Sequence, residues 1–575
     1  MRYRFGYYFL LPVLLFLGAC QHTPDHAQYI PQNALMVAEL NTKELSKKIA
    51  WSMITGSSLL DKLRGRSKDS LQSDFIKNMS EAGVDELNTF YVYAKSNGDK
   101  TPCFVALIPL KDARKWEAFI KKSFADTKVK ETAKRKEARL TDDIYAGWTS
   151  NLLIVVSVQE DQMPYAVAEE VAPDALMTRP ATDKEPLLLS HLESAFNVSK
   201  ETSLLEDKRF ARFEDDHHDF GFWVNIEAVM NNYGSRNIAS MTGGFSPSSA
   251  MWKNSAFSAA TNFEKGRIVT DLLVYSPEEV KEINEEFAKK NIDNDIVDRV
   301  PGDNLNYLMA YRLAPAGIAK TLQKMGISGL ADGMLKEYNL SLNEVLGAIS
   351  GDLVFAMNNF HQQQETVLFD ASDSSSAVTS YKMDMDMLFA LKISNKASFR
   401  KLMDMAVTLK MLQQKGPDAY TLPTLASDTS VILLNDQYAV FSNKQQVAQA
   451  YLQNSNNRKV SGKLAKDHIY KHPFGMFFDY QTWSKGMAMM SGNKADSLVF
   501  AASRNTFESY VFNGGNFADN TIRYQMSINF VNKKENSLLQ LLEFANQLQE
   551  ADNIRQAELE SLEADMANEA DSTLQ

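Results

Sequence analysis

Two patterns of apolar and polar residues alternate along this chain, one typical of strands and one typical of helices. Runs of about six to eight alternating or wholly apolar residues recur, as at 104–108 and 152–158, and short polar turns join several of them. Strands joined by short turns are antiparallel. Between the runs lie stretches with helical spacing, such as the one that carries Trp116, Phe119 and Ile120. The pattern predicts an α+β fold, with antiparallel sheets and helices packed on one face.

The order of these blocks in the first half of the chain returns in the second half. Each half opens with an apolar residue, a proline, a polar turn, a strand and a helix, at 29–53 and from 299 onward. Five further matches follow in the same order: 86–94 with 349–357, 104–107 with 388–391, 152–158 with 431–441, 218–225 with 472–479, and 262–268 with 516–522. We therefore predict two tandem divergent repeats, at 29–295 and 296–551. Two unrelated domains with generic strand and helix patterns are the alternative.

Four segments depart from this pattern. Residues 127–139 are rich in charge and predict a helix or a loop, and 239–250 are rich in glycine and serine. Residues 361–382 contain consecutive glutamines and serines, which predict a mobile insertion. The last 24 residues, 552–575, hold seven acidic residues and one arginine, and predict a frayed helical extension or an acidic tail.

The first twenty residues have a different character. Arg2 and Arg4 precede an almost wholly apolar run at 5–17, and the small residues Gly18 and Ala19 precede Cys20. This order predicts a secretory signal peptide at 1–19. The apolar run is too short to cross a bilayer, which takes about 20 residues.

The segment Leu17-Gly18-Ala19-Cys20 resembles the lipobox of bacterial lipoproteins. In such proteins the cysteine thiol receives a diacylglycerol, the signal is cut before the cysteine, and the new amine is acylated. The resemblance implies lipidation of Cys20, a short tether at 20–28, and a membrane as partner, since each buried methylene contributes about 0.8 kcal/mol. An ordinary cleaved signal followed by an unmodified cysteine is the alternative.

Composition limits the class of protein to which this chain can belong. The 44% hydrophobic content is that of a folded chain, and 575 residues exceed what one core usually fills. A net charge of −11 argues against a nucleic-acid partner, which needs a basic face. Cys103 is the one cysteine besides Cys20 and lies in an apolar strand-like run, so we expect a buried, unreactive thiol.

Histidines are the first candidates for chemistry. His468 and His472 stand four apart, but the glutamate of a zinc hydrolase motif is missing and Pro473 follows at once. His217 and His218 lie in an acidic turn before a predicted strand, and His218 matches His472 in the repeat alignment. We treat these four as weak metal candidates. No serine-hydrolase elbow or phosphate loop is present, so we predict no catalytic residues, no cofactor and no enzymatic activity.

The lipobox, the short tether and the opening Ile30-Pro31-Gln32-Asn33-Ala34 are similar to those of an uncharacterised family of Bacteroidetes lipoproteins, which is known only as a domain of unknown function. The resemblance implies an outer-membrane lipoprotein facing the periplasm or the cell surface. It supplies no catalytic residues.

Three functions follow as hypotheses. The first is a non-catalytic, lipid-anchored envelope protein that binds or scaffolds a protein, lipid or glycan partner. The second is a carrier or sensor of an apolar ligand held between the repeats. The third is a metal-dependent enzyme that uses the region of His218 or His472.

Overall fold

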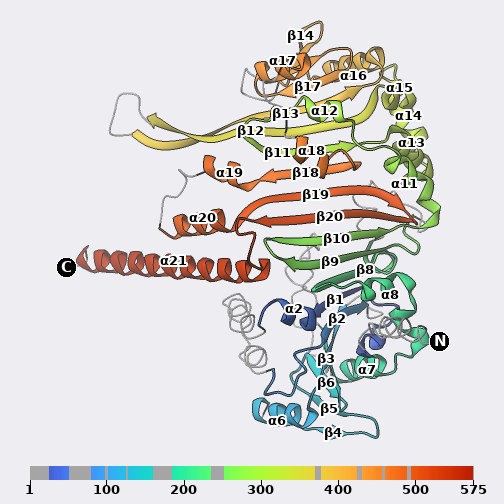
Figure 1. Cartoon of the computed structure of the whole chain (residues 1–575), viewed down its shortest axis with the longest axis vertical. Helices are drawn as coiled ribbons and strands as arrows, with labels where there is room; N and C mark the ends of the chain where they lie inside the picture. Colours follow the sequence, from blue (N-terminus) through green and yellow to red (C-terminus); the bar gives the residue numbers. More distant parts are fainter. Residues whose placement is uncertain are drawn as a thin grey trace, which may run out of the picture. The chain divides into compact units, whose positions relative to one another are not determined.

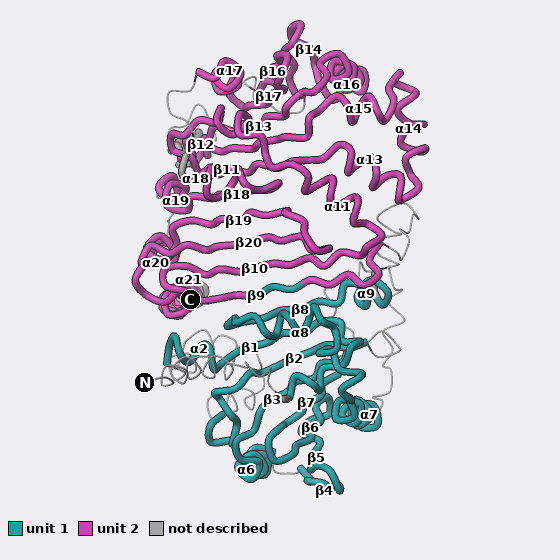
Figure 2. Tube along the Cα trace, turned by 45° about the vertical axis from the view of Figure 1, so that its right-hand side comes forward, with its two compact units in different colours: residues 1–56, 64–238, 258–260 teal, residues 57–63, 239–257, 261–575 magenta. Residues whose placement is uncertain are grey.

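The structure is a computed structural model of the chain. It describes residues 25–50, 79–96, 102–124, 127–158, 184–234, 251–368, 377–423, 430–455, 460, 462–487 and 494–573. The predicted signal peptide, Cys20 and the segment 239–250 lie outside these residues. The chain divides into two compact units (Figure 2): unit 1 comprises 1–56, 64–238 and 258–260, and unit 2 comprises 57–63, 239–257 and 261–575.

Unit 1 is built on antiparallel strands. Its described strands are β1 (Met36–Asn41), β2 (Thr89–Ser96), β3 (Pro102–Pro109), β4 (Lys130–Glu131), β5 (Lys136–Arg139), β6 (Ile144–Trp148), β7 (Leu152–Val158) and β8 (Phe220–Asn225). They pair in the order β4-β5-β6-β7-β3-β2-β1-β8. The helical segments are η1 (Asp25–Tyr29), α2 (Thr42–Lys48), α6 (Ala113–Ser123), α7 (Glu185–Phe196), η3 (Lys200–Thr202), η4 (Leu204–Glu206), α8 (Lys208–Asp215), α9 (Ile226–Val229) and η5 (Met230–Gly234).

Helices cover both faces of the unit 1 sheet. Helix α6 places Trp116 and Ile120 against Trp148 and Leu153 on one face. Helix α7 covers the other face, where a methyl group added to Gly147 would meet Leu192. The prediction of helices on one face was wrong here, because β7 is apolar at consecutive positions and a strand with that pattern is buried on both sides.

Unit 2 is a larger antiparallel sheet. Its described strands are β9 (Ala256–Glu264), β10 (Arg267–Tyr275), β11 (Leu305–Arg312), β12 (Ile349–Leu368), β13 (Ala377–Ile393), β14 (Gln413–Gly416), β15 (Ala419–Thr421), β16 (Val431–Leu434), β17 (Tyr438–Ser442), β18 (Phe474–Asp479), β19 (Phe507–Ala518) and β20 (Thr521–Phe530). They pair in the order β9-β10-β20-β19-β18-β11-β12-β13-β17-β16-β15-β14. The prediction of a mixed helix and sheet fold with antiparallel pairing is confirmed.

The helices of unit 2 also pack on two faces of its sheet. They are η7 (Glu278–Val280), α11 (Lys281–Ala288), α12 (Asn294–Asp298), α13 (Pro315–Lys324), α14 (Ser328–Lys336), α15 (Leu342–Gly347), α16 (Lys396–Thr408), α17 (Gln445–Gln453), α18 (Gly462–His468), α19 (Tyr480–Gly486), α20 (Lys494–Thr506) and α21 (Ser537–Thr573). Helices α12 and α17 bury Ile296 and Tyr451 against Val354 and Leu388. Helix α16 buries Phe399 in a second cluster with Ile393.

Two segments that the sequence pattern classed as irregular form strands. Residues 130–131 and 136–139 pair as β4 and β5, where Ala138 is buried and Glu137 bonds Arg135. Residues 361–368 and 377–382 extend the β12–β13 hairpin, which projects beyond the neighbouring strands (Figure 1). The earlier predictions were wrong because backbone hydrogen bonds between strands do not require a mainly apolar sequence.

The β19–β20 turn and the C-terminal helix each have a defined backbone conformation. The turn between β19 and β20 places Asp519 and Asn520 at φ of 51° and 56°, as a two-residue antiparallel turn requires. Helix α21 continues to Thr573, which is the helical alternative for the acidic C-terminal segment (Figure 1). In the described part of the chain, no helix combines the length and the apolarity that a membrane crossing takes.

Gly351 provides a test of the β11–β12 packing. Its φ is 99°, and a methyl group there would lie 1.6 Å from the carbonyl oxygen of Leu313. We expect Gly351→Ala to lower the free energy of unfolding by about 2 kcal/mol or more, because strain and a backbone clash add. Chemical denaturation measures the change. Gly347→Ala is the control, since nothing lies near its added methyl group and alanine favours a helix; equal losses in both variants would refute the packing argument.

Candidate functional site

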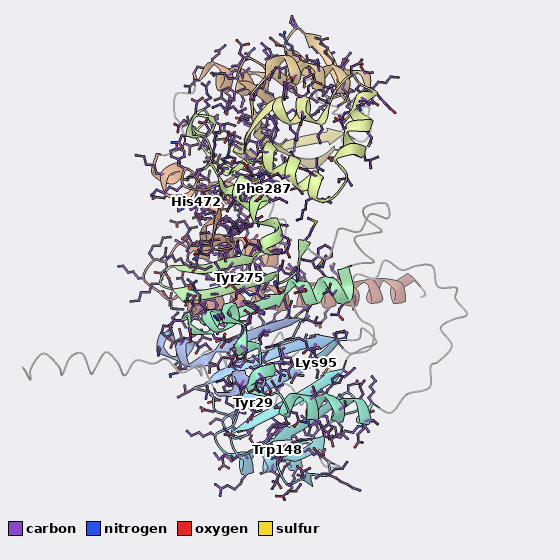
Figure 3. All side chains as sticks on the ribbon, turned by 90° about the vertical axis from the view of Figure 1, so that its right-hand side faces the viewer. Tyr29, Lys95, Trp148, Tyr275, Phe287 and His472 are labelled. Carbon is purple, nitrogen blue, oxygen red and sulfur yellow. The ribbon has the colours of Figure 1, made fainter. Side chains whose placement is uncertain are left out.

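The four histidine candidates do not come together. His468 is the last residue of α18, and His472 precedes β18, so the two do not share a helix face. His472 belongs to unit 2 (Figure 3) and its Nδ1 lies 2.9 Å from the side-chain oxygen of Asn516. His217 is exposed, whereas its neighbour His218 is buried in unit 1. Among the described residues, no group of three or more His, Cys, Asp and Glu side chains is placed to hold a metal ion.

His218 instead belongs to a buried acidic cluster, which we define as Glu39, Tyr91, Glu214 and His218. The imidazole Nε2 of His218 lies 2.8 Å from Oε2 of Glu39. The hydroxyl of Tyr91 donates to Oε2 of Glu214 at 2.6 Å. The carboxyl group of Glu39 also lies close enough to that of Glu214 for its charge to raise the pKa of Glu214. The four side chains therefore form one continuous polar network.

Strand register brings the acidic cluster together. Glu39 on β1 stands directly opposite Tyr91 on β2 and opposite Gly221 on β8. The absence of a side chain at Gly221 leaves room for the cluster, because a methyl group there would lie 2.5 Å from Nε2 of His218. Helix α8, capped by Asp207, supplies Glu214 from above the same sheet face.

Aromatic rings close the cluster against solvent. Phe213 stacks on the His218 ring at 4.7 Å, and the His26 ring meets Tyr91 edge-on at 5.4 Å. Tyr91, His218 and Glu39 are all buried. Glu214 is partly exposed as a whole residue, but its carboxyl group is buried.

This burial shifts the ionisation of the acidic cluster. Desolvation, then the nearby charge of Glu39, raises the pKa of Glu214 well above its usual range, although the Tyr91 hydrogen bond acts the other way. Desolvation alone would lower the pKa of His218, but the hydrogen bond to Glu39 and its charge outweigh it and the pKa is raised. Both directions favour a cluster in which Glu214 keeps its proton and His218 is protonated against Glu39.

A second buried ion pair lies next to the cluster. The Asp219 side chain is fully buried and lies 2.5 Å from Nζ of Lys48, at the end of α2. The backbone N–H of Asn41 donates to the carbonyl of Asp219 and joins β1 to the same turn. Part of the acidic stretch 214–219 is therefore buried and bonds to α2 and β1, whereas its sequence indicated a turn exposed to solvent.

The corresponding ladder positions in unit 2 carry no such network. Ala310 on β11 stands opposite Val354 on β12 and Gly475 on β18, in the places that Glu39, Tyr91 and Gly221 occupy in unit 1. Ala310 and Val354 belong to an apolar core. One signal in the sequence could have revealed the cluster: Glu39 falls two residues after Val37, at the buried parity of an otherwise apolar strand.

Cys103 is buried in β3, as expected. Burial raises the pKa of its thiol to about 12, even though the positive charge of Lys95 acts in the opposite direction. Lys95, labelled in Figure 3, is itself buried, and desolvation lowers the pKa of its ammonium group. A thiol with a raised pKa is a poor nucleophile, so Cys103 serves packing.

Comparisons with known proteins add little. No protein-family model matches the chain, and no curated protein matches it. Among solved structures, crystal forms IV, III and I of TP0453 align at 8, 6 and 7% identity with a TM-score of 0.24 in each case. The alignments cover 43, 44 and 47% of this chain and 79, 80 and 87% of that chain. A likeness at this TM-score carries no argument about fold or function.

The acidic cluster predicts a pH dependence of stability. Both pKa shifts are upward, so the folded state binds more protons than the unfolded state above the ordinary pKa values of these groups. The free energy of unfolding therefore falls as pH rises through that range. Glu214→Gln keeps an oxygen for Tyr91 and removes one titration, so we expect a smaller fall between about pH 5 and about pH 8.

Urea denaturation at several pH values measures this difference. Glu206→Gln is the matched control, because Glu206 is exposed on η4 near the same helix. We expect the control to follow the parent chain. Parallel curves for the parent and Glu214→Gln would show that Glu214 does not titrate as the buried geometry requires.

Proposed function

We propose that this chain is an exported lipoprotein, held to an envelope membrane by acyl chains on Cys20, whose folded body binds or scaffolds a partner without catalysing a reaction. The observation that carries the proposal is the order of the first twenty residues: two arginines, a short apolar run and the segment Leu17-Gly18-Ala19-Cys20. This order fits a cleaved signal better than a membrane span, which takes about 20 apolar residues.

The acidic cluster supports a non-catalytic role for the body. Its ionisable groups bond to one another, and aromatic rings lie over them. A general acid or base must come within hydrogen-bond reach of its substrate. A buried, mutually bonded set of side chains serves that task poorly and serves the positioning of β1, β2, β8 and α8 well.

The proposal also includes the cellular location of the chain and the class of its partner. The resemblance to Bacteroidetes lipoproteins favours the outer membrane, with the body facing the periplasm or the cell surface. A net charge of −11 disfavours contact of the body with anionic lipid and leaves the acyl chains as the means of attachment. Protein, lipid and glycan partners all fit such an exposed body.

We further propose that the chain arose from two copies of one structural unit, at 29–295 and 296–551. Two orders of pairing support this: β4-β5-β6-β7-β3-β2-β1-β8 and β14-β15-β16-β17-β13-β12-β11-β18 follow the same sequence of elements. The compact units divide near 260 because β10 pairs with β20 along nine residues. The boundary at 295–296 stays a prediction.

Replacement of Cys20 tests the anchor. We expect Cys20→Ala to abolish incorporation of labelled palmitate and to move the chain from the membrane to the soluble fraction, because the acyl chains supply the membrane affinity. Cys103→Ala is the matched control and should keep both label and membrane fraction, since Cys103 is buried in β3. A Cys20→Ala chain that still sediments with membranes, or a parent chain without label, would overturn the proposal.

A further inference from the structure

Unit 2 contains a cavity that the acidic cluster and the anchor do not involve. Its volume is about 470 Å³, within the range of about 300–1,000 Å³ that is typical of sites for small organic ligands. It opens between the start of β11, the middle of β12 and the end of α19. Asn304, Asn306, Asn359, His361, Thr482 and Lys485 contribute to its lining.

Asn306 gives this cavity an unused hydrogen-bond donor. The side chain is 1% exposed, and its Oδ1 accepts from the backbone N–H of Phe360 at 3.0 Å. Because a backbone N–H only donates, this bond fixes which side of the amide carries oxygen. The amide nitrogen Nδ2 then has no acceptor among the described residues. Leaving a buried donor unsatisfied costs about 1–3 kcal/mol, which a ligand oxygen would recover.

Lys485 supplies a positive charge at the same cavity. It is exposed on α19, and no carboxylate of the described chain forms an ion pair with it. Asp384 and Asp386 share the ammonium group of Lys444, at 3.1 and 2.7 Å from its Nζ. An exposed ammonium group without a carboxylate partner can bind an oxyanion through a charge-assisted hydrogen bond.

The walls of the cavity are held in place. Asn304 and Asn359 adopt left-handed backbone conformations, with φ of 45° and 54°, and the Asn304 amide donates to Oδ1 of Asn359 at 2.9 Å. Asn359 in turn donates to Asp386 at 2.7 Å. On the opposite wall, a methyl group on Gly486 would lie 2.2 Å from the carbonyl oxygen of Phe360. A preorganised wall loses little entropy when a ligand binds.

We infer that this cavity binds a small acidic carbohydrate, with its oxyanion at Lys485 and an oxygen at the amide of Asn306. The volume exceeds what an isolated anion fills, and the lining offers amide and hydroxyl groups that match sugar hydroxyls. The oxyanion is a carboxylate or a phosphate ester, which share this chemistry. The inference deepens the proposed binding role and rests on it, because it gives the folded body a ligand class.

Calorimetric titration of the full chain in mild detergent tests the site. The probes are glucuronic acid, glucose 6-phosphate, neutral glucose and inorganic phosphate. We expect saturable binding of at least one acidic sugar, and weaker binding of glucose and of inorganic phosphate. Lys485→Gln should weaken binding of the acidic sugar by about tenfold or more, because a hydrogen bond between charged groups is lost.

Two further variants separate the site from general charge effects. Lys415→Gln makes the same change on exposed β14, away from the lining, and should leave the dissociation constant unchanged. Asn306→Asp keeps the acceptor for Phe360 and replaces the donor with a carboxylate, so it should abolish binding. Thermal melting verifies that Asn306→Asp folds. If Asn306→Asp does not fold, the affinity of Lys485→Gln tests the site.

Several results would overturn the inference. They are no saturable binding of either acidic sugar, an unchanged affinity in Lys485→Gln, equal binding of glucose, and inorganic phosphate binding as tightly as glucose 6-phosphate. A chain that takes up palmitate but binds no acidic sugar would refute the cavity and leave the anchor in place. Binding by a chain that carries no lipid would support the cavity and remove the anchor.

Discussion

The register of the antiparallel strands decides which side chains meet throughout this protein. A slip of one residue would exchange the two faces of a strand, so each pairing specifies a complete set of neighbours. In unit 1 the register of β1 sets Glu39 against Tyr91 and Gly221. In unit 2 the register of β11 sets Ala310 against Val354 and Gly475. One pairing scheme thus supports a polar network in one case and an apolar core in the other.

The polar network has consequences for stability as well as for positioning. Ionising two carboxyl groups in one buried site costs free energy, because each charge is desolvated and the two repel. The pKa of Glu214 is therefore raised by its burial and by Glu39. The groups of the network are bonded to one another. The cavity in unit 2 differs, because Asn306 and Lys485 belong to its lining and the Asn306 amide nitrogen has no acceptor among the described residues.

Comparison of particular segments shows where reasoning from sequence succeeds. Amphipathic spacing correctly located α6, and mainly apolar runs correctly located β7, β8 and β18. The match of 104–107 with 388–391 was displaced by one residue, since the ladders place Val105, not Phe104, at the position of Leu388. Composition cannot resolve a one-residue shift between two apolar runs. It also misjudged 127–139, whose charged residues pair across a hairpin.

The sequence by itself determined the mixed helix and sheet character and the pattern at Cys20 that motivates the proposed anchor. These depend on neighbouring residues, whose spacing and conformational preferences can be read directly along the chain. Only the tertiary structure decided that His218 joins Glu39, 179 residues away, while His472 faces Asn516. It also decided that Asn306, Phe360 and Lys485 surround one cavity. Such meetings depend on strand register and helix placement between distant segments, which local spacing does not encode.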